Sequence, residues 1–216
     1  MTSTSHAWED VLATYEREHD PKQPVVCLDE KPVQLLADVR SGRIQANGIR
    51  RIDYEYARRG TANLFVAVQP KVGRYFVEAT KTRTRNDFAK MVGRIARAYP
   101  DALCIHLVLD NLNTHRESSL IRYYGLEKGS ALWSRFRVHH TPKHGSWLNQ
   151  AEIAIGMVAR ECLGKRRLGT IDRLASESGA WRQQANRDRR VIDWRFTRRD
   201  ARRKFDYRPP RLKSGG

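Results

Sequence analysis

The stretch LVLDNLNTH, residues 107–115, joins an apolar segment to a polar one. It closes an apolar run whose length and composition are typical of a buried strand. The run stops at Asp110, and Asn111, Asn113 and His115 follow at once. In α/β folds, ligand sites gather at the carboxyl ends of neighbouring strands. The stretch therefore predicts a buried strand that delivers polar side chains to a site.

Strand-like and helix-like segments alternate around this stretch. We expect strands over residues 25–30, 61–70, 74–80, 102–110 and 135–141. We expect helices over residues 7–18, 85–99, 116–125, 146–165 and 171–188, the fourth of them capped by Ser146. This order favours an α/β fold, a mixed β-sheet flanked by helices, over a sandwich or a bundle. The expected parts are a leader helix and linker (1–24), one main domain (25–190) and a basic C-terminal extension (191–216).

The chain is strongly basic. Its 216 residues include 41 Lys and Arg and 24 Asp and Glu, a net charge of +17, and such a surface prefers an anionic partner such as nucleic acid. Residues 158–216 hold 18 basic and 7 acidic residues, which gives 18 − 7 = +11 of this charge. No apolar run approaches the roughly 18 residues that cross a bilayer, and the first residues lack a signal-peptide pattern. We therefore expect a cytoplasmic protein with no membrane partner.

Three acidic residues interrupt apolar segments. Asp29 ends the first expected strand, Asp110 ends a later one, and Glu152 lies on the helix after the last strand, on a face expected to pack on the sheet. Unpaired carboxylates there would be costly, and divalent cations would turn their repulsion into ligation. Carboxylate oxygens favour Mg²⁺ or Mn²⁺, and a pair of such ions suits phosphoryl transfer. Considered alone, Asp29 or Asp110 could instead simply cap the loop that follows its strand. Glu30 is expected on the opposite face of its strand, outside the site.

Three blocks resemble a known family. CLDEKPVQLL, LVLDNLNTHR and HHTPKHGSWLNQAE, in this order, resemble the DDE transposases of mariner-like bacterial insertion sequences. The resemblance implies a ribonuclease H-like fold for the catalytic domain. It assigns Asp29, Asp110 and Glu152, at intervals of 81 and 42 residues, to the catalytic and metal-binding triad. It also implies metal-dependent DNA cleavage that frees a 3′ hydroxyl, followed by transfer of that hydroxyl to target DNA, commonly at TA.

The resemblance also sets the expected partners. These are DNA, as element ends and as target, and a second copy of the chain, because paired ends must be brought together. Nucleoid association would follow from DNA binding. Family members carry helix-turn-helix modules before the catalytic domain, whereas 28 residues precede Asp29 here. Three readings stay open: a fragment, a catalytic half completed by a separate DNA-binding frame or domain upstream, and a decayed copy. Two alternatives stay open: a structure-specific nuclease of the same fold, and a non-catalytic DNA-binding relic of a transposase.

Further residues are assigned around the triad. Surroundings of the metal or contacts to a DNA end are assigned to Asn111, Asn113, His115, His144, Trp147 and Asn149. A core position is an equally good reading of Trp147. Contacts to the DNA backbone are assigned to eight arginines, with a solvated face as the alternative: Arg187, Arg189, Arg190, Arg195, Arg198, Arg199, Arg202 and Arg203. No zinc site is expected, because the adjacent His139 and His140 would point to opposite faces of a strand.

Overall fold

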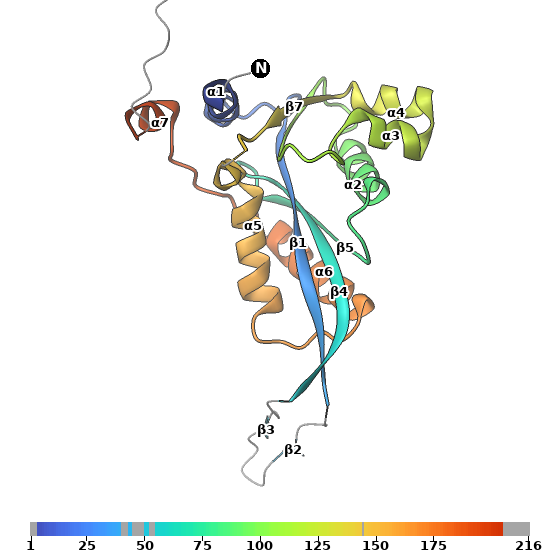
Figure 1. Ribbon diagram of the computed structural model, residues 1–216. Helices are drawn as coiled ribbons and strands as arrows, with labels where there is room; N and C mark the ends of the chain where they lie inside the picture. Colours follow the sequence, from blue (N-terminus) through green and yellow to red (C-terminus); the bar gives the residue numbers. More distant parts are fainter. Residues whose placement is uncertain (1–3, 40–42, 45–49, 52–54, 144, 205–216) are drawn as a thin grey trace, which may run out of the picture.

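A five-stranded mixed sheet forms the centre of the molecule (Figure 1). The structure, a computed structural model, describes residues 4–39, 43–44, 50–51, 55–143 and 145–204. The strands are β1 (Val25–Asp38), β4 (Tyr56–Gln69), β5 (Arg74–Thr80), β6 (Ile105–Leu109) and β7 (Phe136–His140). Their order is β5-β4-β1-β6-β7. β4 is antiparallel to β1 and to β5, whereas β6 runs parallel to β1 and to β7. The expected mixed sheet is therefore present.

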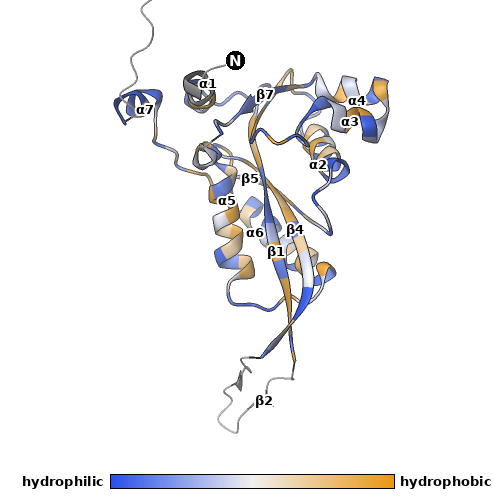
Figure 2. Cartoon of the chain, viewed as in Figure 1, coloured by the Kyte–Doolittle hydropathy of each residue, from blue (hydrophilic) through white to orange (hydrophobic). Residues whose placement is uncertain are grey.

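Helices cover both faces of this sheet. They are α1 (Thr4–Glu16), α2 (Arg85–Ala98), α3 (Glu117–Tyr124), α4 (Leu126–Trp133), α5 (Ala151–Val158), α6 (Ile171–Arg187) and α7 (Arg198–Lys204), with short turns η1 (Ser146–Leu148) and η2 (Ala159–Leu163). One core cluster joins α1, α5 and α6 to the sheet, and the other joins α2 and α3 to its opposite face. Figure 2 shows apolar residues along the central strands and a hydrophilic α7. No described helix combines the length and apolar content needed to cross a membrane.

β1 is longer than the strand predicted over residues 25–30. It continues to Asp38 as an antiparallel ribbon with β4, towards the two-residue strands β2 (Arg43–Ile44) and β3 (Arg50–Arg51) (Figure 1). Pro32 lies inside this extension. The pairing of β1 with β6 ends at Cys27, so the other edge of β1 needs no backbone donor at Pro32. A proline at a free edge therefore does not end the strand.

One predicted helix start is wrong, and one helix was not predicted. Ser146 does not cap a long helix, because η1 forms first and α5 begins only at Ala151, whose N–H donates to Asn149 Oδ1. The chain also contains α4, which the sequence did not predict. Gly125 ends α3 at φ +88 and accepts a hydrogen bond from the Gly129 N–H as α4 begins. A glycine that stops one helix thus starts the next directly.

α1 packs into the main core. Its residues Trp8, Val11 and Leu12 are buried in the cluster that also holds β1, β4 and α5. From the other end of the chain, α7 reaches α1 through the ion pair of Arg198 with Glu16. Segments on both sides of the boundaries predicted at residues 24 and 190 therefore contribute to one core.

Candidate active site

β1 and β6 place two aspartates side by side. Their parallel pairing ends with Cys27 opposite Val108, and Asp29 and Asp110 each lie two residues beyond this last pair. The charge of Asp110 is close enough to raise the pKa of Asp29. Asp29 shares a face of β1 with Cys27, the face covered by α5, whereas Asp110 lies just after β6 and contacts His115. The two aspartates are thus neighbours at the carboxyl end of β6.

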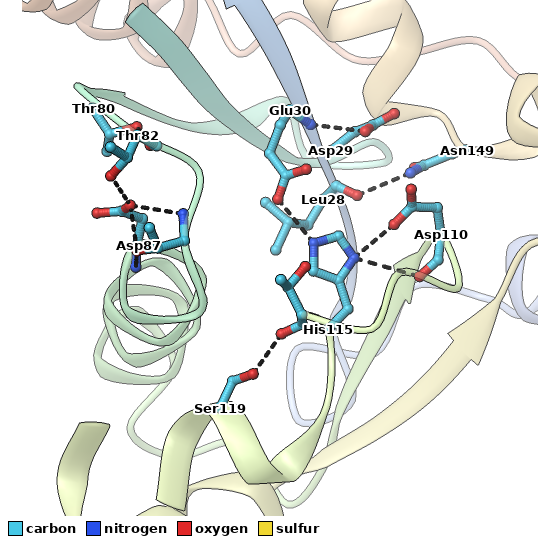
Figure 3. Close-up of polar contacts among 12 residues, drawn as sticks. Leu28, Asp29, Glu30, Thr80, Thr82, Asp87, Asp110, His115, Ser119 and Asn149 are labelled. Carbon is cyan, nitrogen blue, oxygen red and sulfur yellow. Dashed lines mark hydrogen bonds and ion pairs between the residues drawn. The ribbon is translucent and has the colours of Figure 1, made fainter. Parts of the chain in front are cut away.

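The first turn of α5 is tied to β1 beside Asp29. Glu152 lies in this turn, and its backbone N–H donates to the Asn149 carbonyl at 3.0 Å. Asn149 is buried, its Nδ2 donates to the Leu28 carbonyl at 2.9 Å, and its Oδ1 accepts from the Ala151 N–H at 3.1 Å (Figure 3). Asn149 therefore positions the helix that carries Glu152, and a buried side chain with these bonds has no free group for a DNA end.

The expectation that Glu152 packs on the sheet is wrong. Glu152 is exposed, whereas Leu148 and Ile155 are buried. The buried residues of α5 are Ala151, Ala154, Ile155 and Val158, and Glu152 lies outside the face that they form. The site is open to solvent on this side. Burial therefore gives no reason for a metal at Glu152, and the argument for one rests on the charges that meet there.

Asp29 carries the strongest electrostatic signal of the three acids. Burial raises its pKa to about 7, and the charges of Glu152, Asp110 and Glu30 add to the rise, although the Glu30 N–H donates to its Oδ1 at 2.7 Å. A divalent cation would relieve this repulsion, so the donor set fits a hard metal ion. Among the described residues, no group of three or more His, Cys, Asp or Glu is arranged as a ready metal site. The fit therefore rests on charge and position, and the carboxylates would have to turn towards an ion.

Glu30 contributes to the site in a way that the sequence did not predict. Its side chain is 5% exposed, and its Oε1 lies 2.8 Å from His115 Nε2, while His115 Nδ1 lies 2.6 Å from Asp110 Oδ1 (Figure 3). His115 is buried and stacks on Phe88. Burial lowers the pKa of His115, but its contacts with the two acids prevail and raise it to about 9. His115 is therefore a buried cation that links Glu30 to Asp110. The only signal in the sequence was that Asp29 and Glu30, which are consecutive and so lie on opposite faces of one strand, are both acidic.

The other residues assigned around the triad lie mostly on the surface. Asn111 and Asn113 are exposed, and Asn113 accepts a hydrogen bond within its own loop. Trp147 is 44% exposed and packs edge-on against Phe196 with ring centroids 5.3 Å apart, so it is a surface residue and not a core one. His144 lies outside the described residues.

Many of the C-terminal arginines have partners within the chain. Five of the eight assigned to the DNA backbone form ion pairs with described acids: Arg190, Arg195, Arg198, Arg202 and Arg203. The other three, Arg187, Arg189 and Arg199, are exposed and form no ion pair with a described acid. Part of the positive charge at this end of the chain is therefore neutralised internally.

Comparison with known proteins gives one family and one fold. The model of the DDE superfamily endonucleases matches residues 24–175. The Mos1 mariner paired end complex with Mn is similar at a TM-score of 0.53 and 14% identity, over 85% of this chain and 56% of that chain. The Mos1 strand transfer complex is similar at a TM-score of 0.56 and 14% identity, over 83% of this chain and 52% of that chain. No curated protein matches. These likenesses confirm the expected ribonuclease H-like fold, and the chain spans little more than half of the Mos1 chain.

Proposed function

Because the chain belongs to the DDE superfamily endonucleases, we propose that it is a transposase catalytic domain that cleaves DNA and transfers the freed 3′ hydroxyl to target DNA. The meeting of the acids carries the proposal, because β1 and β6 run side by side and the charge of Asp110 reaches Asp29. Glu152 is near enough for its charge to raise the pKa of Asp29. A Mos1 complex of similar fold is a strand transfer complex, which supports the second step.

Asp29, Asp110 and Glu152 are the proposed ligands of the metal. Endonucleases of this superfamily use divalent metal ions, and one similar Mos1 structure contains Mn. All three side chains offer carboxylate oxygens, which favour Mg²⁺ or Mn²⁺, and we propose two ions. When bound, such a pair activates the attacking oxygen and stabilises the leaving one.

The chain's own residues hold these ligands in place. His115 contacts Asp110 from one side while Glu30 contacts His115 from the other, so the Asp110 carboxylate has a fixed neighbour. Asn149 fixes the start of α5 against β1, which limits how far Glu152 can move relative to Asp29. Partners of this kind set the orientation of metal ligands and lower the cost of ordering them.

The proposal extends to the partners of the domain. The substrates are element ends and target DNA, with TA as the preferred target. The domain acts as a homodimer, because two ends have to be joined in one event. Recognition of the ends comes from a separate upstream module, and the protein associates with the nucleoid through its DNA.

A cleavage assay with the DNA that flanks the reading frame tests the function. Wild type and the control Asp101→Asn, which changes an exposed acid after α2, are expected to nick this DNA in Mg²⁺ and to join its 3′ ends. Asp110→Asn is expected to do neither. Equal nicking by Asp110→Asn and wild type would reject the assigned site.

The products separate the alternatives. Cleavage without joined 3′ ends would show a structure-specific nuclease instead of a transposase. Absence of cleavage, together with DNA binding that is indifferent to Mg²⁺ and survives Glu152→Gln, would show a DNA-binding relic.

A further inference from the structure

A basic groove lies along the edge strand β5 and helix α2, outside the acidic site. It has a volume of about 870 Å³, and Lys81, Lys90, Arg94 and Arg97 are among the residues that line it. Residues 81–98 contain six Lys or Arg and one Asp, which gives 6 − 1 = +5. This is a second concentration of positive charge, separate from the C-terminal extension.

The acids of the groove leave most of its cations unpaired. Asp87 accepts hydrogen bonds from the threonines that precede α2 and completes the cap of that helix. Glu78 forms an ion pair with Arg94. Three exposed cations of the groove form no ion pair with any acid in the described part of the chain: Lys81, Lys90 and Arg97. At the C-terminal end, in contrast, five of the eight arginines are paired.

The groove lies beside the acidic site, because His115, which contacts Asp110, stacks on Phe88 in the first turn of α2. β1 and β5 are both antiparallel to β4, and β6 is parallel to β1, so β5, β1 and β6 all run in the same direction. In the sheet register, Glu30 pairs with Phe65, and Phe65 pairs with Glu78 in the groove. Two strand spacings amount to roughly 10 Å. Figure 3 shows Asp87 across from Glu30 and His115.

We propose that this groove binds the phosphate backbone of the DNA duplex whose scissile phosphate lies at Asp29 and Asp110. Lysine and arginine side chains on an open helix surface contact phosphates and fix the register of the duplex without reading its sequence. The inference rests on the proposed function and adds the path of the substrate across the domain.

The salt dependence of DNA binding tests this path. Binding of a short mixed-sequence duplex is measured in EDTA, which keeps cleavage out of the result, for wild type, Lys90→Gln/Arg97→Gln and the control Arg122→Gln/Lys128→Gln. The control removes two charges from α3 and α4. Each phosphate contact contributes about 0.9 to the slope of log affinity against log salt. The groove variant is expected to lower this slope by about 1.8, and the control to leave it unchanged.

Two outcomes would overturn the proposal that the groove binds the DNA backbone. One is a slope that the groove variant leaves unchanged, and the other is an equal fall in both variants, which would show a response to net charge alone. The proposed function is judged separately, by the loss of cleavage in Asp110→Asn. If Asp110→Asn loses cleavage while the groove variant keeps the wild-type slope, the function stands and the path is wrong. If Asp110→Asn cleaves as wild type does, the function is wrong whatever the slope.

Discussion

Replacing Asp29 with asparagine should stabilise the metal-free protein above neutral pH. Burial, together with the neighbouring acids, raises the pKa of Asp29 from its usual 3.8 to about 7. Between these values the unfolded chain has lost the proton and the folded chain still holds it, so the free energy of unfolding falls as the pH rises. The difference, 7 − 3.8 or about 3.2 units at 1.36 kcal/mol each, corresponds to about 4 kcal/mol lost by pH 8. Asparagine avoids this loss and keeps an Oδ1 acceptor for the Glu30 N–H.

Urea denaturation in EDTA at pH 5 and pH 8 measures the effect. Both proteins are expected to lose stability between the two, because the unfolded chain releases the His115 proton that the folded chain retains. Wild type is expected to lose more than Asp29→Asn, and the variant to be the more stable protein at pH 8. Excess Mg²⁺ should reverse the order, because a ligand that binds only the folded state stabilises the protein that can bind it. Asp101→Asn, an exposed change, serves as the control. Parallel pH profiles for wild type and Asp29→Asn would refute this account of the site.

Two further substitutions test other parts of the structure. Gly73→Ala should lower the free energy of unfolding by about 1–3 kcal/mol, since Gly73 has φ +69 and a Cβ would lie 2.5 Å from the Arg189 carbonyl carbon. The control Gly60→Ala, with φ +95 and open space around it, should lower the free energy of unfolding less. Equal denaturation midpoints for the two variants would contradict the close contact at Gly73. His115→Gln should slow Mg²⁺-dependent cleavage by roughly 10- to 100-fold with DNA affinity retained, and an unchanged cleavage rate would show that the buried cation only supports packing.

The fold class and the three acids could be predicted because their signals are local. The apolar run before Asp110 and the short run before Asp29 mark strands, and α2 shows its buried face through Phe88, Val92 and Ile95. The interval of 81 residues between the two aspartates reappears as the offset of the parallel register between β1 and β6. Asp110 follows the end of β6 as predicted, whereas the prediction that Asp29 ends its strand is wrong, because β1 continues to Asp38.

The remaining features depend on contacts between distant segments. The exposure of Glu152 depends on which face of α5 meets the sheet, and the spacing to Leu148 and Ile155 did not reveal that face. The contact of Glu30 with His115 joins residues 85 positions apart. The C-terminal arginines find acids in α1, with Arg198 and Arg202 bonded to residues 182 and 193 positions away. Composition shows that such charges exist, but only the folded chain shows which of them are already satisfied.

The docking of α1 against η1 limits how the catalytic unit can be trimmed. Tyr15 donates from its hydroxyl to the Leu148 carbonyl at 2.9 Å and packs edge-on against Trp194. A fragment cut to residues 24–175 would retain all three acids yet lose both Tyr15 and Trp194. The turn that precedes Glu152 would then stand without its support, so an inactive minimal fragment would say nothing against the chemistry of the intact chain.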